Sequence, residues 1–246
     1  MKRLENKVAL VTGGSRGMGA AIAKRLAAEG ATVVITYHRS PEKAQAVITA
    51  IEKSGQKGLA IAADSADPAA VMAAVNTTVG NYGRIDILVN NAGIYIGKPV
   101  SEYTLADYNS TMDVNVKAVF FASTTAAAHM PRGGRIISIG SNMAERAGGT
   151  QTVLYTMSKT ALTGLTKGLA HDLGPKGITI NLVQPGHTDT DMNPADGVIA
   201  DMVRDTIPTG GYGTVEDIAS LVAYLASEES RYINGASLTI DGGVNA

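Results

Sequence analysis

Short runs of aliphatic and β-branched residues alternate with longer segments along the whole chain. The short runs contain few polar residues, and such runs are typical of strands that are buried on both faces of a parallel sheet. We therefore expect seven strands, over residues 7–13, 31–37, 58–64, 85–93, 134–141, 178–186 and 236–243.

The longer segments carry apolar residues three or four positions apart, which is the period of one face of a helix. Ile22 and Leu26 show this spacing in the first segment, as do Ala161, Leu165 and Leu169 in a later one. Helices are expected in a segment that contains Tyr155 and over residues 17–30, 41–55, 68–83, 104–129, 195–206 and 215–227.

Strands and helices alternate from the first strand to the last, and this order predicts an α/β fold. The expected architecture is a doubly wound parallel sheet with helices on both faces. The sequence contains no internal repeat, low-complexity tract or linker, so a single domain is expected over residues 1–246. In such a sheet, ligands bind beyond the carboxyl ends of the strands. Unusual residues at those ends are therefore the candidates for a functional site.

Composition narrows the classes of protein and of partner. The chain has 246 residues, of which 45% are hydrophobic, enough for one large core. A formal net charge of −1 gives no electrostatic attraction to nucleic acid or to an anionic membrane surface, so neither is expected as a partner. The absence of cysteine excludes disulfides, thiolate catalysis and thiolate metal sites, and we expect no metal.

No apolar run in the sequence approaches the ~20 residues of a membrane-spanning helix. The run that begins near the N-terminus is too short for a signal peptide and is interrupted by Gly13 and Gly14. A cytoplasmic location is therefore expected.

The first predicted strand ends in a glycine-rich turn that continues directly into a helix. Gly13, Gly17 and Gly19 permit a tight turn and a close approach of the backbone to a ligand. The helix N-terminus offers free N–H groups and the positive end of a dipole, both of which favour a pyrophosphate. Taken alone, such a turn can equally be an ordinary connection.

Tyr155 and Lys159 are four residues apart, which places both side chains on one face of a helix. A phenol with a pKa near ~10 exchanges protons poorly at neutral pH. A cation at about 4 Å, at an effective dielectric constant of about 20, stabilises the phenolate by roughly 4 kcal/mol, or about three pKa units. None of the other eight tyrosines has a lysine four residues later. One such pair among nine tyrosines could still be an accident.

The spacing of the glycine-rich turn, the sequence Asn90-Asn91-Ala92-Gly93, Ser141 and the Tyr155/Lys159 pair occur together over the full length of the chain. In this combination the chain resembles the short-chain dehydrogenase/reductase family, and within it the 3-oxoacyl-carrier-protein reductases. The resemblance implies a Rossmann-type sheet of seven strands and a nicotinamide cofactor. It also implies a cofactor half over about residues 1–140 and a catalytic and substrate half over about 141–246.

The same resemblance implies roles for four catalytic residues. Tyr155 is the general acid or base, and Lys159 lowers its pKa and holds the nicotinamide ribose. Ser141 orients the substrate carbonyl, and Asn115 positions a water beside Lys159. The alternatives from the sequence alone are a serine that merely ends a strand and an asparagine that caps a helix.

The cofactor contacts that the resemblance implies lie in four loops. Asp64 and Ser65 match the adenine contact, although Asp64 could instead cap the next helix. His187 stands where the family has an apolar residue, and we interpret it as a difference in the pocket lining. The other expected cofactor contacts are Gly13, Ser15, Arg16, Gly17, Met18, Gly19, Asn90, Ala92, Gly93, Pro185, Gly186, Thr188 and Thr190, together with Tyr155 and Lys159.

The end of the second predicted strand indicates which nicotinamide is used. An NAD site places Asp or Glu there to hold the ribose 2′-hydroxyl, whereas this chain has His38 and Arg39. Arg39 and Arg16 can pair with a 2′-phosphate through charge-assisted hydrogen bonds. NADP(H) is therefore the expected cofactor.

The segment over residues 187–213 resembles a mobile lid over the substrate. Gly211 stands where carrier-protein reductases usually have arginine, and Ser141 and Tyr155 are one residue further apart than in many family members. Arg132 and Lys176 match basic positions of the carrier-protein reductases, which is thin support for such a partner. We expect reduction of a small or medium ketone, β-keto ester or diketone in preference to a carrier-bound acyl group. The apolar residues that could face it are Met192, Val198, Ile199, Met202 and Val203.

Two other functions stay open. The departures from the carrier-protein reductases also resemble a bacterial biofilm-dispersal mediator of this family, which suggests a regulator that binds a cyclic dinucleotide. The chain could also act as an alcohol or sugar dehydrogenase in the oxidative direction. Small residues in the Tyr155 helix, among them Gly164 and Gly168, favour close packing against another element. The resemblance makes that element the same helix of a second subunit and implies a homotetramer, whereas the alternative is packing within one chain.

Overall fold

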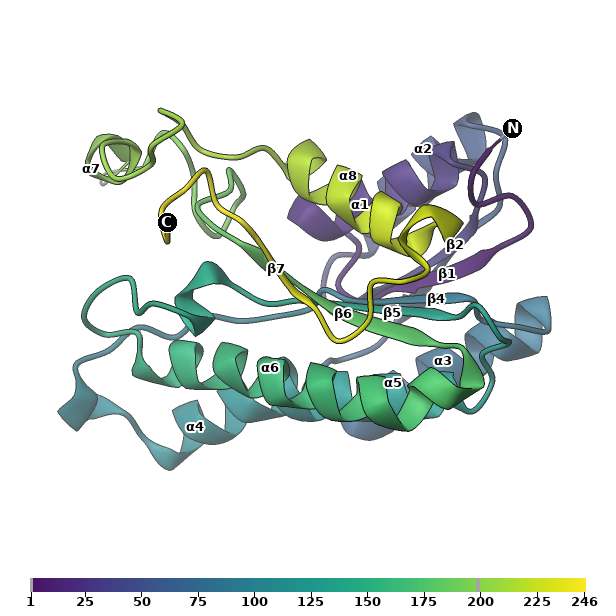
Figure 1. The fold of residues 1–246 in the computed structure, drawn as a ribbon, viewed down its shortest axis with the longest axis horizontal. Helices are drawn as coiled ribbons and strands as arrows, with labels where there is room; N and C mark the ends of the chain where they lie inside the picture. The colour runs from purple at the N-terminus through teal and green to yellow at the C-terminus, as the bar shows by residue number, and fades with distance from the viewer. Residues whose placement is uncertain (1, 198–199) are drawn as a thin grey trace.

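A computed structural model describes residues 2–197 and 200–246 of the chain. Its centre is a parallel sheet of seven strands in the order β3-β2-β1-β4-β5-β6-β7 (Figure 1). All seven predicted strands form. They are β1 (Val8–Val11), β2 (Thr32–Tyr37), β3 (Gly58–Ala62), β4 (Ile87–Asn90), β5 (Arg135–Ile139), β6 (Thr179–Pro185) and β7 (Ser237–Ile240).

Helices cover both faces of this sheet, as expected for a doubly wound fold (Figure 1). Helices α1, α2 and α8 share one hydrophobic core with the sheet, and α3, α5 and α6 share another on the opposite face. The helices are α1 (Gly17–Ala28), α2 (Pro41–Lys53), α3 (Pro68–Tyr82), α4 (Leu105–Met112), α5 (Ala118–Ala127), α6 (Val153–Leu173), α7 (Ala200–Arg204) and α8 (Val215–Ala226). Of the helix expected over residues 195–206, α7 covers Ala200–Arg204; residues 195–197 form a turn and a bend, and residues 198–199 lie outside the described part.

The strand order reverses direction at β1, which lies between β2 and β4. The loops that follow these strands therefore diverge to opposite faces and leave a crevice at their carboxyl ends. The predicted strands are longer than the observed ones mainly at this edge, because the residues that follow β1, β4 and β5 leave the sheet to form loops. Gly13, for example, has a φ of +63°, which takes it out of the extended conformation.

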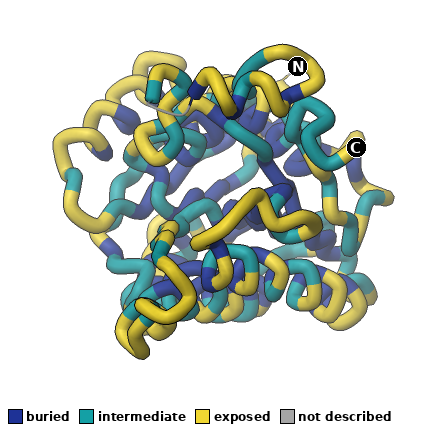
Figure 2. The backbone as a smooth tube through the Cα atoms, turned by 90° about the vertical axis from the view of Figure 1, so that its left-hand side faces the viewer, coloured by how far each residue is buried: buried dark blue, intermediate teal, exposed yellow. Residues whose placement is uncertain are grey.

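Burial on both faces holds for the inner strands but not at the margins of the sheet. Every residue of β1, β4, β5 and β6 is buried, whereas β3 and β7 contain half-buried and exposed residues. Figure 2 shows the buried backbone in the interior and exposed backbone around it. The two outer strands each lack a neighbour on one side, so helices and loops cover them less completely.

The helix expected over residues 104–129 is interrupted. Helix α4 begins with a capping box between Thr104 and Asp107, and a π-helical turn, Asp113–Lys117, separates α4 from α5. Such π-helical turns occur frequently at functional sites. Here the turn contains Asn115, whose exposed fraction is 1%.

In residues 2–197 and 200–246, no helix combines the length and the apolar character that crossing a bilayer would require.

Candidate active site

Tyr155 and Lys159 lie on the inner side of helix α6, near its N-terminus. Lys159 has an exposed fraction of 4%, and its Nζ donates a hydrogen bond to the carbonyl oxygen of Ile139 at 2.8 Å. The same Nζ lies 5.6 Å from the centroid of the Tyr155 ring. The spacing in the sequence therefore does bring the cation beside the phenol.

The protonation equilibria of this pair differ from the expectation. Burial raises the pKa of Tyr155, and the hydroxyl of Ser141 acts in the opposite direction. The net direction is therefore upward, the opposite of the lowering expected from Lys159. The physical reason is that desolvation disfavours the phenolate. Desolvation also lowers the pKa of Lys159 to about 8.

Ser141 follows strand β5 and faces the hydroxyl of Tyr155. Its Oγ also accepts a hydrogen bond from the N–H of Met143 at 3.2 Å and caps a short 3-10 turn. The serine is thus more than the end of a strand: the turn fixes its side chain beside the phenol.

Asn115 does not cap a helix, because it lies inside the π-helical turn. Its Oδ1 accepts from the N–H of Ile94 at 2.9 Å, and its Nδ2 donates to the carbonyl of Ile94 at 3.0 Å. Nδ2 also donates to the hydroxyl of Ser158 at 3.0 Å. A Cβ atom placed on Gly93 would lie 3.5 Å from both Asn115 Oδ1 and Lys159 Nζ. The predicted catalytic residues therefore converge on the loop after β4.

Tyr95 is a site residue that sequence reasoning missed. Its ring packs edge-on against the Tyr155 ring, with 5.2 Å between centroids and an interplanar angle of 74°. The hydroxyls of Tyr95 and Tyr103 both donate to the carbonyl of Gln151, at 3.4 and 3.1 Å. Gln151 has a φ of +63°, which is unusual for a residue with a side chain. Two tyrosines thus hold the loop before α6, and no motif in the sequence marks them.

The glycine-rich turn is packed closely against itself and against the loop after β4. A Cβ atom on Gly19 would lie 2.5 Å from Asn91 Nδ2 and from the carbonyl of Gly13, so only glycine fits there. Arg16 begins helix α1 without a side-chain cap, which leaves the first N–H groups of the helix without a side-chain acceptor. The turn fits a pyrophosphate. Ser15 is half-buried, and Met18 packs against the core below.

The loop after β4 is tied to this turn. The hydroxyl of Thr12 accepts from the N–H groups of Asn91 and Ala92, at 3.0 and 3.1 Å. Asn90 points into the interior, where its Nδ2 donates to Ser123 and Ser138 at 3.0 and 3.2 Å. Its buried Oδ1 has no hydrogen-bond partner among the described residues.

Beyond the ends of β2 and β3, His38 and Asp64 face one another with 3.5 Å between Nε2 and Oδ2. Asp64 does not cap helix α3. Its Oδ1 accepts from the N–H of Ala66 at 2.9 Å, whereas Asp67 is the capping residue of that helix. Ser65 lines a small cavity beside Asn90 and Ala92.

Arg16 extends from the turn toward residue 191 of the lid segment. Its Nη1 lies 3.3 Å from Asp191 Oδ2, and Lys43 Nζ lies 3.6 Å from the same oxygen. Arg39 is exposed and makes no ion pair with the described residues. Lys43 was not expected, since it lies four residues beyond the position that decides the cofactor. The structure brings it into the same cluster of charges.

The loop after β6 contains the last group of predicted cofactor contacts. Pro185 is buried at the end of the strand, and Gly186 packs so closely on Asp241 that a Cβ atom would lie 2.4 Å from the Asp241 Cβ. Thr188 is buried, with its Oγ1 donating to the carbonyl of Gly186 at 3.2 Å. Thr190 lies beside Gly17, 3.7 Å from a Cβ atom placed there. Of these positions, Thr190 lies against the glycine-rich turn, whereas Gly186 packs on Asp241.

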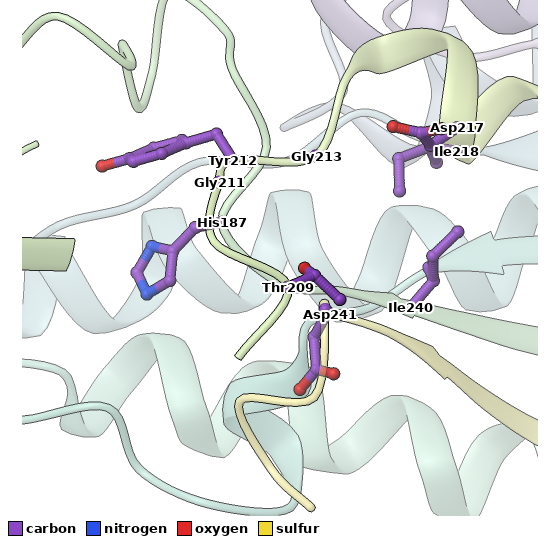
Figure 3. Close-up of a pocket in the computed structure, with 10 residues that line it drawn as sticks. His187, Thr209, Gly211, Tyr212, Gly213, Asp217, Ile218, Ile240 and Asp241 are labelled. Atoms are coloured by element: carbon purple, nitrogen blue, oxygen red, sulfur yellow. The ribbon is translucent and has the colours of Figure 1, made fainter. Parts of the chain in front are cut away.

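A cavity of about 340 Å³ opens beyond the ends of β6 and β7 (Figure 3). His187 and Tyr212 line one side, with their ring centroids 5.8 Å apart. Ile218 and Ile240 lie across from them, and Asp241 lies below. Part of its lining, including His187 and Tyr212, belongs to the segment over residues 187–213 that was expected to determine the substrate.

Comparisons with known proteins agree with the fold described above. A family model described as enoyl-(acyl carrier protein) reductase matches residues 13–245. The cyclic-di-GMP-binding biofilm dispersal mediator protein of Escherichia coli (strain K12) is 41% identical over 246 residues, which cover 100% of both chains. A short-chain dehydrogenase from Burkholderia cenocepacia J2315, solved in complex with NADP, is 56% identical, with a TM-score of 0.98 over 99% of this chain and 100% of the other. A blue fluorescent protein from a metagenomic library, solved with NADPH, is 52% identical, with a TM-score of 0.97 over the same shares.

Proposed function

Because this chain belongs to the short-chain dehydrogenase/reductase family of oxidoreductases, we propose that it is an NADPH-dependent reductase of small carbonyl compounds with Tyr155 as the general acid. The observation that carries the proposal is the buried ammonium of Lys159 beside the Tyr155 ring. Burial of a cation is costly. A ligand-binding protein without catalysis would have no need of this pair.

The glycine-rich turn and the N-terminus of α1 would hold the pyrophosphate of NADPH. Arg16 and Lys43, which already share one carboxylate, would hold the 2′-phosphate together with Arg39. No carboxylate that could bind a 2′-hydroxyl follows Tyr37 directly. When bound, NADPH supplies the hydride that the carbonyl carbon accepts.

Residues of the chain itself would bind and protonate the carbonyl oxygen of the substrate. The Tyr155 hydroxyl donates its proton to the carbonyl oxygen, and the Ser141 hydroxyl, which faces it, orients the same oxygen. The Lys159 ammonium favours the resulting phenolate. Asn115 keeps the loop after β4 against α6 through its bonds to Ile94 and Ser158.

A small substrate suits the residues around the site better than a carrier-bound acyl chain. Arg132 precedes β5 and Lys176 precedes β6, so both lie at the edge of the sheet opposite to Tyr155. They do not form a basic rim around the site of their own chain. In the lid segment, Met192 and Met202 are exposed and available to an apolar ketone. Val198 and Ile199 lie outside the described residues.

The proposal is tested by a reduction panel that follows the loss of NADPH absorbance with acetoacetyl thioesters, keto esters, diketones, quinones and sugars. Turnover of keto esters or diketones is expected. Activity confined to acetoacetyl-carrier protein, and lost in Arg132→Glu, would contradict the preference for small substrates. The same panel run with NADP⁺ and alcohols or sugars tests the oxidative direction.

A second candidate function follows from the 41% identity to a cyclic-di-GMP-binding protein. A regulator of this kind would bind the dinucleotide whether or not it reduced a ketone. Calorimetry with cyclic di-GMP, set beside NADPH, separates the two functions. Micromolar binding of the dinucleotide without turnover of any carbonyl would favour the regulator.

We also propose that the chain assembles as a homotetramer through helix α6. Cβ atoms placed on Gly164 and Gly168 would meet no described atom within 4 Å, so these glycines do not serve packing within the chain. Phe120 on the neighbouring helix α5 is 43% exposed. An open, smooth helix face beside an exposed aromatic ring suits the same face of a second subunit. Light scattering at micromolar concentration should give a tetramer.

A further inference from the structure

The cavity behind His187 lies close to the catalytic serine. Residues of β5 and β6 pair in register as far as Ile139 and Val183. Ser141 follows the end of β5 by two residues and His187 follows the end of β6 by two, so both lie in loops at the same edge of two adjacent strands. A substrate whose carbonyl contacts Ser141 can therefore place a neighbouring substituent in the cavity.

A second contact closes the base of the cavity toward the serine. Asn142, which follows Ser141, donates from Nδ2 to Asp241 Oδ2 at 3.3 Å. Its carbonyl accepts from Asn245 Nδ2 at 2.7 Å. The C-terminal residues are thus attached to the loop that carries Ser141, so the cavity and the carbonyl site share one wall.

Two aromatic side chains offer uncompensated polar groups at this end. In Figure 3 the rings of His187 and Tyr212 lie on the same side of the loop that carries Gly211 and Gly213, and their planes are tilted by 55°. Burial lowers the pKa of His187, and Asp241 acts in the opposite direction; burial thus favours the neutral imidazole, which carries one donor and one acceptor. The Tyr212 hydroxyl is shielded from solvent and has no hydrogen-bond partner in the described part of the chain.

The charged residues that line the cavity are both acidic, and the nearby Arg204 guanidinium lies 6.0 Å from the centroid of the Tyr212 ring. Asp217 and Asp241 line it, and none of its lining residues is lysine or arginine. Asp241 accepts from the N–H groups of Gly243 and Asn245, at 2.9 and 3.0 Å. Hydrogen bonds from the Thr214 backbone and side chain lower the pKa of Asp217. A ligand carboxylate in this cavity would therefore meet two carboxylates, whereas the nearby Arg204 is already paired with Asp201.

Gly211 leaves the wall open at one point. A Cβ atom there would meet no described atom within 4 Å, and the backbone is not in the left-handed region. A side chain of either charge could be accommodated at this position, which makes the charge of the cavity adjustable by one substitution.

We propose that this cavity is a distal substrate subsite that accepts a neutral, oxygen-bearing substituent, such as an ester or a second ketone, and excludes a carboxylate. The inference rests on the proposed carbonyl reduction and specifies its substrate class. His187 donates to the neutral oxygen, while Asp217 and Asp241 repel an anion. A volume of about 340 Å³ holds an ester with a short alkyl chain.

The test compares two substrates that differ only in this group, methyl 4-oxopentanoate and 4-oxopentanoate. Wild-type kcat/KM should favour the ester by roughly tenfold or more, which corresponds to about 1.4 kcal/mol. Gly211→Arg should reduce that ratio at least fivefold by admitting the acid. Gly211→Gln, of similar length but neutral, should leave the ratio unchanged.

The role of His187 has its own control. His187→Phe should lower kcat/KM for the ester roughly two- to tenfold and leave 2-pentanone, which has no second oxygen, unchanged. His187→Gln, which keeps a hydrogen-bond donor, should restore kcat/KM for the ester. If His187→Phe lowered kcat/KM for the ester and for 2-pentanone equally, the assigned role would be overturned.

Calorimetry separates this inference from the proposed function. The NADP⁺-loaded protein is titrated with the methyl ester and the acid of 4-hydroxypentanoate, which need no turnover. If no ketone is reduced, the proposed function fails, and the calorimetric ratio alone decides the subsite. Tighter binding of the ester supports the subsite. Equal binding, or tighter binding of the acid, overturns it.

Discussion

The Nζ of Lys159 donates a hydrogen bond to the carbonyl oxygen of Ile139, at 2.8 Å, and thereby joins helix α6 to the last residue of strand β5. This bond holds the ammonium in the interior against Ile139, which precedes Ser141 by two residues. Burial at this position desolvates the ammonium and lowers the pKa of Lys159.

The first prediction concerns pH. Burial lowers the pKa of Lys159 from 10.5 to about 8, so the ammonium is present below that pH and is lost as the pH rises through it. We expect kcat/KM for NADPH, which reports the free enzyme, to fall above about pH 8. A pH profile from 6 to about 10 measures this. A profile flat across that range would show that the charge of Lys159 is not needed.

The second prediction concerns Asp191, which pairs with Arg16 and Lys43. If these cations bind the 2′-phosphate, the carboxylate competes with it, and Asp191→Asn should tighten NADPH binding. Exposed pairs contribute about 0.2–1 kcal/mol, so a factor of roughly 1.5 to 5 is expected. NADH binding should not change, and the effect should shrink at high salt.

Fluorescence titration of both cofactors at low ionic strength makes this measurement. Asp205→Asn is the matched control, because Asp205 is an exposed acid of the lid segment without an ion pair among the described residues. Weaker NADPH binding in Asp191→Asn would mean that the ion pairs of Asp191 with Arg16 and Lys43 support the cofactor site and do not compete with the 2′-phosphate.

The third prediction concerns assembly. Gly164→Arg adds a long charged side chain to the open face of α6 and should convert the tetramer to smaller species without unfolding the subunit. Gly80→Arg is the control, since Gly80 lies in helix α3 and also has no described atom within 4 Å of a Cβ position. Light scattering and circular dichroism should show a change of mass in Gly164→Arg only. An unchanged mass in both variants would remove α6 from the interface.

The fold could be predicted from the sequence because each layer has its own period. Uninterrupted apolar runs define the strands of the sheet, and apolar residues three or four positions apart define the helices on both of its faces. The interruption of the helix over residues 104–129 was missed, because a π-helical turn adds one residue to a helical period without changing its composition. Asn115 could be assigned a role from the resemblance, but its bonds to Ile94 and Ser158 depend on that turn.

The grouping of residues at the strand ends was predictable, because the carboxyl ends of parallel strands lie at one edge of the sheet and their loops meet there. Contacts between distant loops were not. Tyr95 reaches Tyr155 across 60 residues, and Asp191 reaches Arg16 across 175. Neither pair follows a sequence period, since side chains of unrelated loops meet only once the sheet has formed. The direction of the Tyr155 pKa was wrong for a similar reason, because the spacing reveals the cation but not the desolvation.

The central claim is that Tyr155 is the general acid, and one substitution tests it. Removing a general acid costs about 10² to 10⁴ in rate. Tyr155→Phe should therefore reduce keto ester turnover at least about a hundredfold while NADPH binding, followed by fluorescence, stays within about threefold of wild type. Tyr95→Phe, which removes a hydroxyl from the adjoining ring, is the control and should keep most of the activity. A Tyr155→Phe enzyme that retains more than about a tenth of wild-type turnover would contradict the claim.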